Sequence, residues 1–387
     1  MAVTYTALEA LEKLISFDTT SHLSNLDLMA FVQEYLEAYG IQSRLIYNED
    51  QTKANLHACI GDINKPGLIL SGHTDVVPVE GQDWSSDPFQ AIEKNGKIFG
   101  RGACDMKGFV AVVLSKVPQM VQARLTKPIH LVFSYDEEVG CKGVRSMVTH
   151  IANDLPVKPD MCIVGEPTLM QVINGHKAVN RMECHISGHE CHSSLAPYGV
   201  NAVEYGADLI THIKKIARRL QNEGPFNTDY DPPFTTLHVG TFNGGTAANI
   251  VPNIGQFNFE MRSIPEQDID AIISEIRDYA YKILEPEMKD KDPKSGFEFN
   301  HSVQTPALST PDTDSLVHLV QNITGENTTY KVSFSTEAGL FQHAGIPTVV
   351  CGPGSIEQAH KPDEYIAVDQ VVKCEKFMDD ILKSLSV

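Results

Sequence analysis

The side chains best suited to catalysis in this sequence are histidines and carboxylates that follow short apolar runs. His73 and Asp75 lie at the end of one such run, residues 67–77. Side chains two residues apart on a strand share a face, so both can point into one crevice. The pair is typical of a histidine metal ligand with an acid that orients its ring, and a capped turn is the alternative.

Asp105 is a second candidate, and it lies between Gly102 and Gly108. The glycines allow the backbone to bend sharply beside it. Asp105 also stands at a predicted helix start, where aspartate commonly caps the helix. Taken alone, this residue is explained better by capping than by metal binding.

A third group of acids follows the apolar run 129–135 and consists of Asp136, Glu137 and Glu138. Adjacent carboxylates at a buried strand end repel one another, so we expect a cation such as a metal ion beside them. A surface loop is the alternative. Glu166 directly follows another apolar run, 161–165, and repeats the pattern.

His360 completes the set from a loop that begins with two glycines. The candidate ligands are then His73, Asp105, Glu138, Glu166 and His360. Histidines and carboxylates without thiolates favour a co-catalytic zinc pair with a bridging carboxylate, although iron or manganese would accept the same ligand types. The sequence lacks G-x-S-x-G and G-x-G-x-x-G, so serine-hydrolase and dinucleotide-binding functions are not supported.

The elements that must position these residues alternate along the chain. Predicted strands lie at 67–77, 129–135, 161–165 and 347–352, and predicted helices lie at 24–40, 105–121, 139–151 and from about 368. Apolar strands alternating with helices predict an α/β domain with a largely parallel mixed sheet covered by helices.

The pattern changes near residue 178, where a half-exposed alternating strand begins. Further strands and the long predicted helices 202–221 and 267–284 indicate a small α+β domain inserted into the first. We therefore expect one domain from 1–177 and 293–387, interrupted by a second at 178–292.

Bulk properties limit the possible partners. The chain has 387 residues, which favours two domains, and its net charge of -19 would repel nucleic-acid phosphates. No stretch has the character of a signal peptide or a membrane span, and the eight cysteines form no C-x-x-C pair. We expect a cytoplasmic protein without membrane or nucleic-acid partners.

In order along nearly the whole chain, these segments resemble the dinuclear-zinc amidohydrolase family of acetylornithine deacetylase, succinyl-diaminopimelate desuccinylase, aminoacylase and carboxypeptidase G. The matching motifs are SGHTDVVP, GRGACDMKG, DEEVG, GEPT, GHECHSSLAPYGVNA, NIVPN, EMR and GPGS-x-x-x-AH. Within the family, SYDEEVGCKGVRSM, STEAGLFQ and GPGSIEQAHKPDEY are most similar to acetylornithine deacetylase.

The resemblance implies a role for each candidate ligand. His73 and Glu166 would bind one metal ion, and Glu138 and His360 would bind the other. Asp105 would bridge the two ions, which would be zinc, with cobalt as the alternative. It also implies that residues 1–177 and 293–387 form the catalytic domain, and that the inserted domain serves dimerisation and closes as a lid.

The resemblance assigns further residues to catalysis and substrate binding. Asp75 would orient His73, and Glu137 would be the general base and acid. His192 would reach the substrate carbonyl across a homodimer interface. Arg262 and Asn249 would contact the substrate carboxylate or carbonyl.

The sequence departs from many relatives at Ser335-Thr336-Glu337-Ala338, where they have Ser-Asp-Gly. This shifts the expected specificity away from desuccinylation. Glu337 is predicted to pair with a cationic substrate side chain such as that of ornithine, with helix capping as the alternative.

The activity implied by the resemblance is metal-dependent hydrolysis of an N-acyl amino acid. The expected substrate is N-acetyl-L-ornithine, cleaved to L-ornithine and acetate in arginine biosynthesis. A broader aminoacylase, dipeptidase or carboxypeptidase is the alternative within the family. An inactive relative that binds a metabolite or a partner protein is the alternative of another class.

Overall fold

The computed structural model describes residues 3–387, which divide into two compact units. The first unit contains the chain up to Gly175, Leu308–Lys331 and Thr336–Val387, and the second contains His176–Ala307 and Val332–Ser335. The second unit thus extends past the expected boundary at 293. The reason is strand β12 (Gly296–Thr305), which pairs along its length with β9 (Ala178–Ser187).

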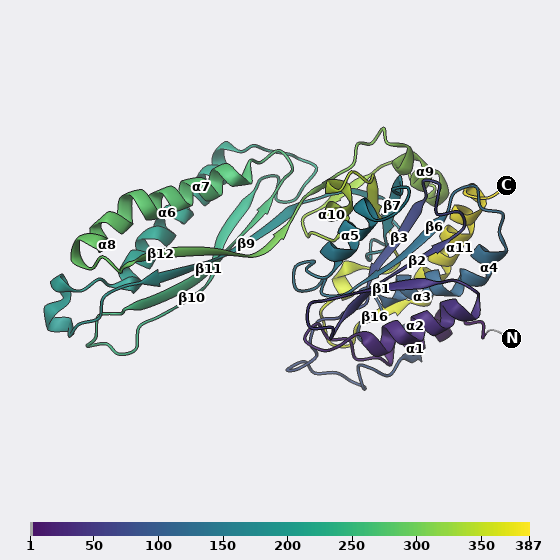
Figure 1. Ribbon diagram of the computed structural model, residues 1–387, viewed down its shortest axis with the longest axis horizontal. Helices are drawn as coiled ribbons and strands as arrows, with labels where there is room; N and C mark the ends of the chain where they lie inside the picture. Colours follow the sequence, from purple (N-terminus) through teal and green to yellow (C-terminus); the bar gives the residue numbers. More distant parts are fainter. Residues whose placement is uncertain (1–2) are drawn as a thin grey trace. The chain divides into compact units, whose positions relative to one another are not determined.

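The first unit is built on a mixed sheet whose central strands are parallel (Figure 1). From one edge to the other, the strands are β1 (Ser43–Tyr47), β2 (Ala54–Ile60), β6 (Ile129–Ser134), β3 (Leu68–His73), β7 (Met161–Val164), β15 (Thr348–Val350), β8 (Ile173–His176) and β13 (Leu308–Ser309), and β14 (Tyr330–Val332) pairs with β8. β6, β3, β7 and β15 run parallel, and β1, β2 and β8 pair antiparallel. The predicted α/β class with a largely parallel mixed sheet is confirmed.

Helices cover both faces of this sheet, as predicted. One layer is formed by α1 (Ala7–Ile15), α2 (Leu26–Ala38), α3 (Lys107–Ser115), α4 (Val117–Gln122), α9 (Ser315–Thr324) and α11 (Val368–Ser384). The other layer contains α5 (Val144–Asn153) and α10 (Ala338–His343). The predicted helix 105–121 is two helices, which meet at Lys116 just before Pro118. Proline lacks the backbone N–H that would donate to the carbonyl four residues earlier, which explains the break, and it is tolerated in the first turn of the second helix.

Alternate residues along the central strands point to opposite layers. Leu68, Leu70, Leu131 and Phe133 are fully buried in the core that contains α3. The side chains between them therefore point toward the layer of α5 and α10. A small separate sheet, β16 (Tyr365–Ala367), β5 (Lys97–Phe99) and β4 (Ile92–Lys94), and the short helix η3 (Ile356–Gln358) complete the unit.

The second unit is an α+β fold with an antiparallel sheet, as predicted. Its strand order is β10 (Thr236–Gly244), β11 (Ile254–Ser263), β9 and β12. The helices are η1 (Ser193–Tyr198), α6 (Ala202–Glu223), α7 (Ile269–Tyr279), η2 (Ala280–Leu284) and α8 (Glu285–Lys291). Phe257, Phe259 and Met261 of β11 belong to the buried core of this unit, and the residues between them form the more exposed face. Among residues 3–387, no helix combines the length and the apolar character needed to span a membrane.

Candidate metal centre

Three neighbouring parallel strands bring most of the candidate ligands together. His73 is the last residue of β3, Glu137 and Glu138 follow β6, and Glu166 follows β7. Because β6, β3 and β7 are adjacent and parallel, their carboxyl ends lie at the same edge of the sheet. Segments that are distant in the sequence therefore meet in one acidic cluster.

Asp105 lies at the centre of this group, in the loop between β5 and α3. Its Oδ1 is 3.0 Å from His73 Nε2, and its Oδ2 is 3.3 Å from His360 Nε2. The cap of α3 is Met106 and has no side-chain hydrogen bond, so Asp105 is not a helix cap. Gly102 has the positive φ of 78° that the sharp bend requires, and a Cβ there would lie 2.7 Å from Val76 Cγ1.

The two histidines face different acids on the two sides of Asp105. His73 Nε2 is 3.8 Å from Glu166 Oε1, and His360 Nε2 is 2.9 Å from Glu138 Oε2. His73, Asp105 and Glu166 are buried, and the side chain of His360 is 53% exposed. The arrangement is two His–Glu pairs that share one aspartate.

Glu137 and Glu138 occupy different positions in the cluster. Glu138 can hold an ion together with His73 and Asp105, and Glu137 can do so together with His73 and Glu166. The two glutamates also differ in their contact with His360. In the part of the chain that the structure describes, Glu138 contacts His360 and Glu137 does not. Glu137 Oε1 instead accepts a hydrogen bond from the Cys141 thiol, with a distance of 3.1 Å.

The raised pKa values of the clustered side chains indicate that their excess negative charge would be stabilised by a cation. Burial raises the pKa of Glu137 to about 8 and that of Glu138 to about 7. Burial also raises the pKa of Glu166 well above its ordinary value, and Asp105 beside it adds to this shift. Burial opposes protonation of His73, but Glu166 and Asp105 raise its pKa well above its ordinary value. A bound divalent cation would replace the protons that these groups otherwise retain.

The donor set fits a pair of divalent ions. It contains imidazole nitrogens and carboxylate oxygens without a thiolate ligand, which is the chemistry of zinc and related first-row metals. Asp105 presents one oxygen to each side, as a bridging ligand must. Hydrogen bonds to Asp105 and Glu138 raise the pKa of His360 to about 10, so this exposed histidine also responds to the excess of negative charge.

Asp75 contacts His73 mainly through its backbone. His73 Nδ1 is 2.9 Å from the backbone oxygen of Asp75 and 3.6 Å from its carboxylate. The carboxylate accepts hydrogen bonds from the Ser21 hydroxyl and from the N–H groups of Glu137 and Glu138. The acid predicted to orient a histidine therefore also holds the turn that carries both glutamates.

The structure contradicts the predicted substrate contact of Glu337. This side chain is fully buried beneath the cluster, and its two oxygens accept hydrogen bonds of 2.6 Å from Ser71 and 2.7 Å from Ser134. It occupies the N-cap position of α10, but its side chain makes no hydrogen bond to the first turn of this helix. Burial explains why it does not face a substrate, because Glu337 joins β3 and β6 and exposes no oxygen.

The remaining predicted site residues belong to the second unit. His192 is exposed, and its Nδ1 accepts a hydrogen bond from the Ser194 N–H at the start of η1. Asn249 is also exposed. It lies beside His192, because its backbone oxygen accepts a hydrogen bond from the N–H of the next residue, Ser193. The Arg262 side chain is 38% exposed on the polar face of the sheet, where its Nε donates to Glu260 Oε1 over 2.9 Å.

Sequence reasoning missed Glu364, a carboxylate that is 1% exposed. It accepts hydrogen bonds from the backbone N–H groups of Gly102, Cys104 and Asp105 and from the Arg101 guanidinium. The signal available was a third acid in the same motif as His360, after Glu357 and Asp363. Its burial depends on β16 pairing with β5, which the sequence pattern did not reveal.

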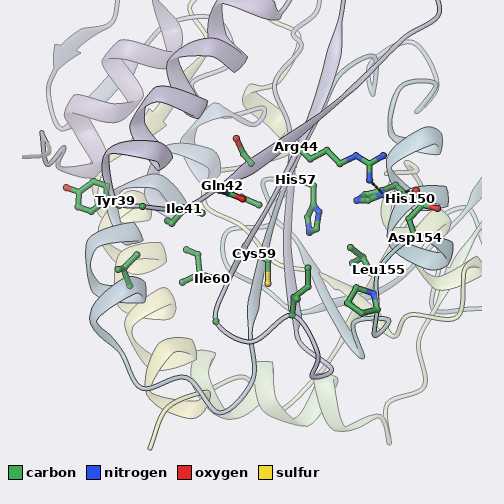
Figure 2. A pocket seen from close by; sticks show the side chains of 17 residues that line it. Tyr39, Ile41, Gln42, Arg44, His57, Cys59, Ile60, His150, Asp154 and Leu155 are labelled. Atoms are coloured by element: carbon green, nitrogen blue, oxygen red, sulfur yellow. Dashed lines mark hydrogen bonds and ion pairs between the residues drawn. The ribbon is translucent and has the colours of Figure 1, made fainter.

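A cavity of about 720 Å³ elsewhere on the first unit contains none of these residues (Figure 2). It is lined by Arg44, His57 and His150, with Cys59 nearby (Figure 2). His57 Nε2 is 3.0 Å from His130 Nδ1, and burial lowers the pKa of His57 to about 3 and that of His130 to about 4. These histidines therefore form an uncharged, hydrogen-bonded pair, separate from the carboxylate cluster.

Comparisons with known proteins agree with the site. Residues 69–384 match the model of peptidase family M20/M25/M40. The acetylornithine deacetylase of Proteus mirabilis (strain HI4320) is 32% identical over 384 residues, which cover 98% of this chain and 95% of that protein. The acetylornithine deacetylase of Pectobacterium carotovorum subsp. carotovorum (strain PC1) is 35% identical over 317 residues, covering 81% and 79%.

Solved structures share the fold. An M20 family metallo-carboxypeptidase from Sulfolobus solfataricus superposes with a TM-score of 0.74 at 20% identity, covering 98% of this chain and 99% of that chain. A dinuclear metal-binding peptidase of the M20 family from Bacillus subtilis superposes with a TM-score of 0.66 at 15% identity, covering 98% and 97%. The match of the family model and the full-length relatives lead to one conclusion: the chain belongs to peptidase family M20/M25/M40.

Proposed function

We propose that this chain hydrolyses the acetyl amide of N-acetyl-L-ornithine, releasing L-ornithine and acetate, with two divalent ions that are zinc or cobalt. The observation that carries the proposal is Asp105, whose two oxygens each lie near a different histidine. Full-length relatives named acetylornithine deacetylase support the choice of substrate.

In this proposal the five ligands divide as their contacts suggest. His73 and Glu166 hold one ion, and Glu138 and His360 hold the other, with Asp105 shared between them. When bound, the ions would make a water molecule more acidic and would polarise the amide carbonyl.

Glu137 is the proposed proton carrier. It lies beside the ligands, and burial raises its pKa to about 8, so the carboxylate is a stronger base than a free glutamate. We propose that Glu137 takes a proton from the attacking water and returns it to the leaving amine.

The second unit supplies the proposed substrate contacts. Arg262 would bind the substrate α-carboxylate with its planar fork of donors, and Asn249 would contact the substrate beside it. His192 would stabilise the developing negative charge on the carbonyl oxygen, a contribution of roughly 3–4 kcal/mol per donor in comparable sites. We propose that His192 comes from the partner in a homodimer. We propose a cytoplasmic location for the enzyme.

The decisive experiment is an assay of the purified protein on N-acetyl-L-ornithine, with added zinc or cobalt and with a chelator control. N-acetyl-methionine, N-succinyl-diaminopimelate and dipeptides complete the panel. We expect metal-dependent turnover that is fastest on N-acetyl-L-ornithine. Faster turnover of another compound would reassign the substrate, and no turnover despite bound metal would refute the enzymatic function.

A further inference from the structure

His360 lies in a loop, so no helix or strand holds it directly. It lies in the loop between η3 and β16, with a φ of 62°, and half of its side chain is exposed. His73, in contrast, ends a central strand that pairs on both sides. Something other than the sheet must therefore hold His360 at the correct distance from Asp105.

Glu364 provides the first half of that support. Its Oε1 accepts hydrogen bonds from the N–H groups of Cys104 (2.9 Å) and Asp105 (3.0 Å). Its Oε2 accepts from the Gly102 N–H (3.0 Å) and from Arg101 Nη1 (2.7 Å). One buried carboxylate from the His360 loop thus binds the backbone of the Asp105 loop at three points.

Arg101 and Gln82 provide the second half. Arg101 is 1% exposed, and its Nη1 also donates to the backbone oxygen of Lys361. Its Nη2 donates to Gln82 Oε1 over 2.5 Å, and Gln82 Nε2 donates to the backbone oxygen of His360 over 3.1 Å. The guanidinium lies 5.0 Å from the ring of Trp84, which donates to the same Gln82 oxygen.

We propose that Glu364, Arg101 and Gln82 are positioning residues that set the distance between Asp105 and His360, and so determine the affinity of the second ion. This inference rests on the proposed function, because it requires two bound ions. The first ion depends on His73 and Glu166, which follow β3 and β7. Disturbing Gln82, which donates to the backbone of His360, should therefore weaken the second ion selectively. Disturbing Glu364 also loosens the loop of the shared ligand Asp105 and should weaken the second ion more than the first.

Metal titration of the whole protein tests this directly. The metal-free chain is titrated with cobalt, followed by calorimetry and by visible absorption, and zinc per chain is measured after dialysis. For Gln82→Ala we expect the first ion to bind as in the wild type and the second to bind at least about tenfold more weakly, the loss typical of a disturbed residue behind a metal ligand. Glu364→Gln should weaken the second ion by a larger factor and the first ion to a smaller extent, because it also loosens the Asp105 loop.

The controls separate positioning from general damage. Gln90→Ala changes an exposed glutamine in the same loop and should leave both affinities unchanged. Thermal unfolding of each variant identifies misfolding, and if Glu364→Gln does not fold, Gln82→Ala decides. Equal weakening of both ions, or an unchanged second affinity in a folded variant, would overturn the inference.

The outcome also separates this inference from the proposed substrate. If the wild type binds two ions but does not cleave N-acetyl-L-ornithine, the proposed function fails and the titration still tests the positioning network. If the wild type binds only one ion, the positioning inference is wrong regardless of which amide is cleaved.

Discussion

The carboxylate of Asp75 accepts a hydrogen bond from the backbone N–H of Glu137, with 3.1 Å between Oδ1 and N. Asp75 follows β3 and Glu137 follows β6, so this bond joins the ends of two parallel strands. This hydrogen bond fixes the turn that carries both glutamates. In this turn Glu138 contacts His360, while Glu137 remains beside His73. The division of labour between Glu137 and Glu138 can therefore be tested by substitution.

We predict opposite effects for the two adjacent glutamates. Glu137→Gln should retain both ions and reduce kcat by about 10²–10⁴-fold, the usual contribution of a general base. Glu138→Ala should reduce the metal content, because it removes the carboxylate that contacts His360. Metal analysis and steady-state kinetics on the same preparations give the answer. Normal metal content in Glu138→Ala with loss of metal in Glu137→Gln would exchange the two assignments.

Arg262 and Arg181 form a matched pair on the polar face of the second unit. Both donate to Glu260, and the two side chains are 38% and 45% exposed. Arg262→Lys should raise KM for N-acetyl-L-ornithine with little change in kcat, because lysine cannot bind a carboxylate with two parallel hydrogen bonds. Arg181→Lys should leave KM unchanged. Equal effects of both substitutions would mean that the arginines act only through the shared salt bridge.

A mixing experiment can detect a site shared between two chains. His192→Ala and Glu137→Gln should each be nearly inactive alone. If His192 acts in the partner's site, mixed dimers contain one complete site, and an equal mixture should recover about a quarter of the wild-type activity. Full activity of a monomer, or no recovery after verified subunit exchange, would show that each chain builds its own site.

The carboxylate cluster should contribute less to the stability of the metal-free protein as the pH rises. Burial raises the pKa of Glu137 to about 8 and that of Glu138 to about 7, compared with 4.5 for an unperturbed glutamate. Hydrogen bonds to Asp105 and Glu138 raise the pKa of His360 to about 10. All three groups bind protons more tightly in the folded state, so their stabilisation is complete below the unfolded pKa and is lost as the pH passes the folded pKa.

Thermal unfolding between pH 5 and 9, with and without zinc, measures this effect. The increase in Tm on adding metal should grow with pH, because ions replace the lost protons. Glu137→Gln should show a shallower decline of Tm for the metal-free protein. The same change of metal-free Tm with pH in the wild type and in Glu137→Gln would contradict the predicted role of Glu137.

Local pattern was sufficient for most of the fold. Apolar runs such as 67–77 and 129–135 predicted the central strands, and their alternation with helices predicted the parallel sheet, because both are consequences of short-range periodicity. Acids and histidines at the ends of these strands identified the cluster, since parallel strands end at a common edge. The end of the inserted unit was misplaced because the pairing of β12 with β9 joins segments about a hundred residues apart.

The contacts within the site were decided only by the tertiary structure. Glu337 looks like a substrate ligand in the sequence, but two serine hydroxyls occupy its oxygens inside the first unit. Glu364 looks like one more loop acid, but it is buried against the Asp105 loop. The amino-acid sequence by itself determined which elements form and which side chains stand at their ends. The pairing of carboxylate oxygens with imidazole nitrogens depended on strand order and loop packing. Strand order and loop packing bring together residues as far apart in the sequence as Glu138 and His360.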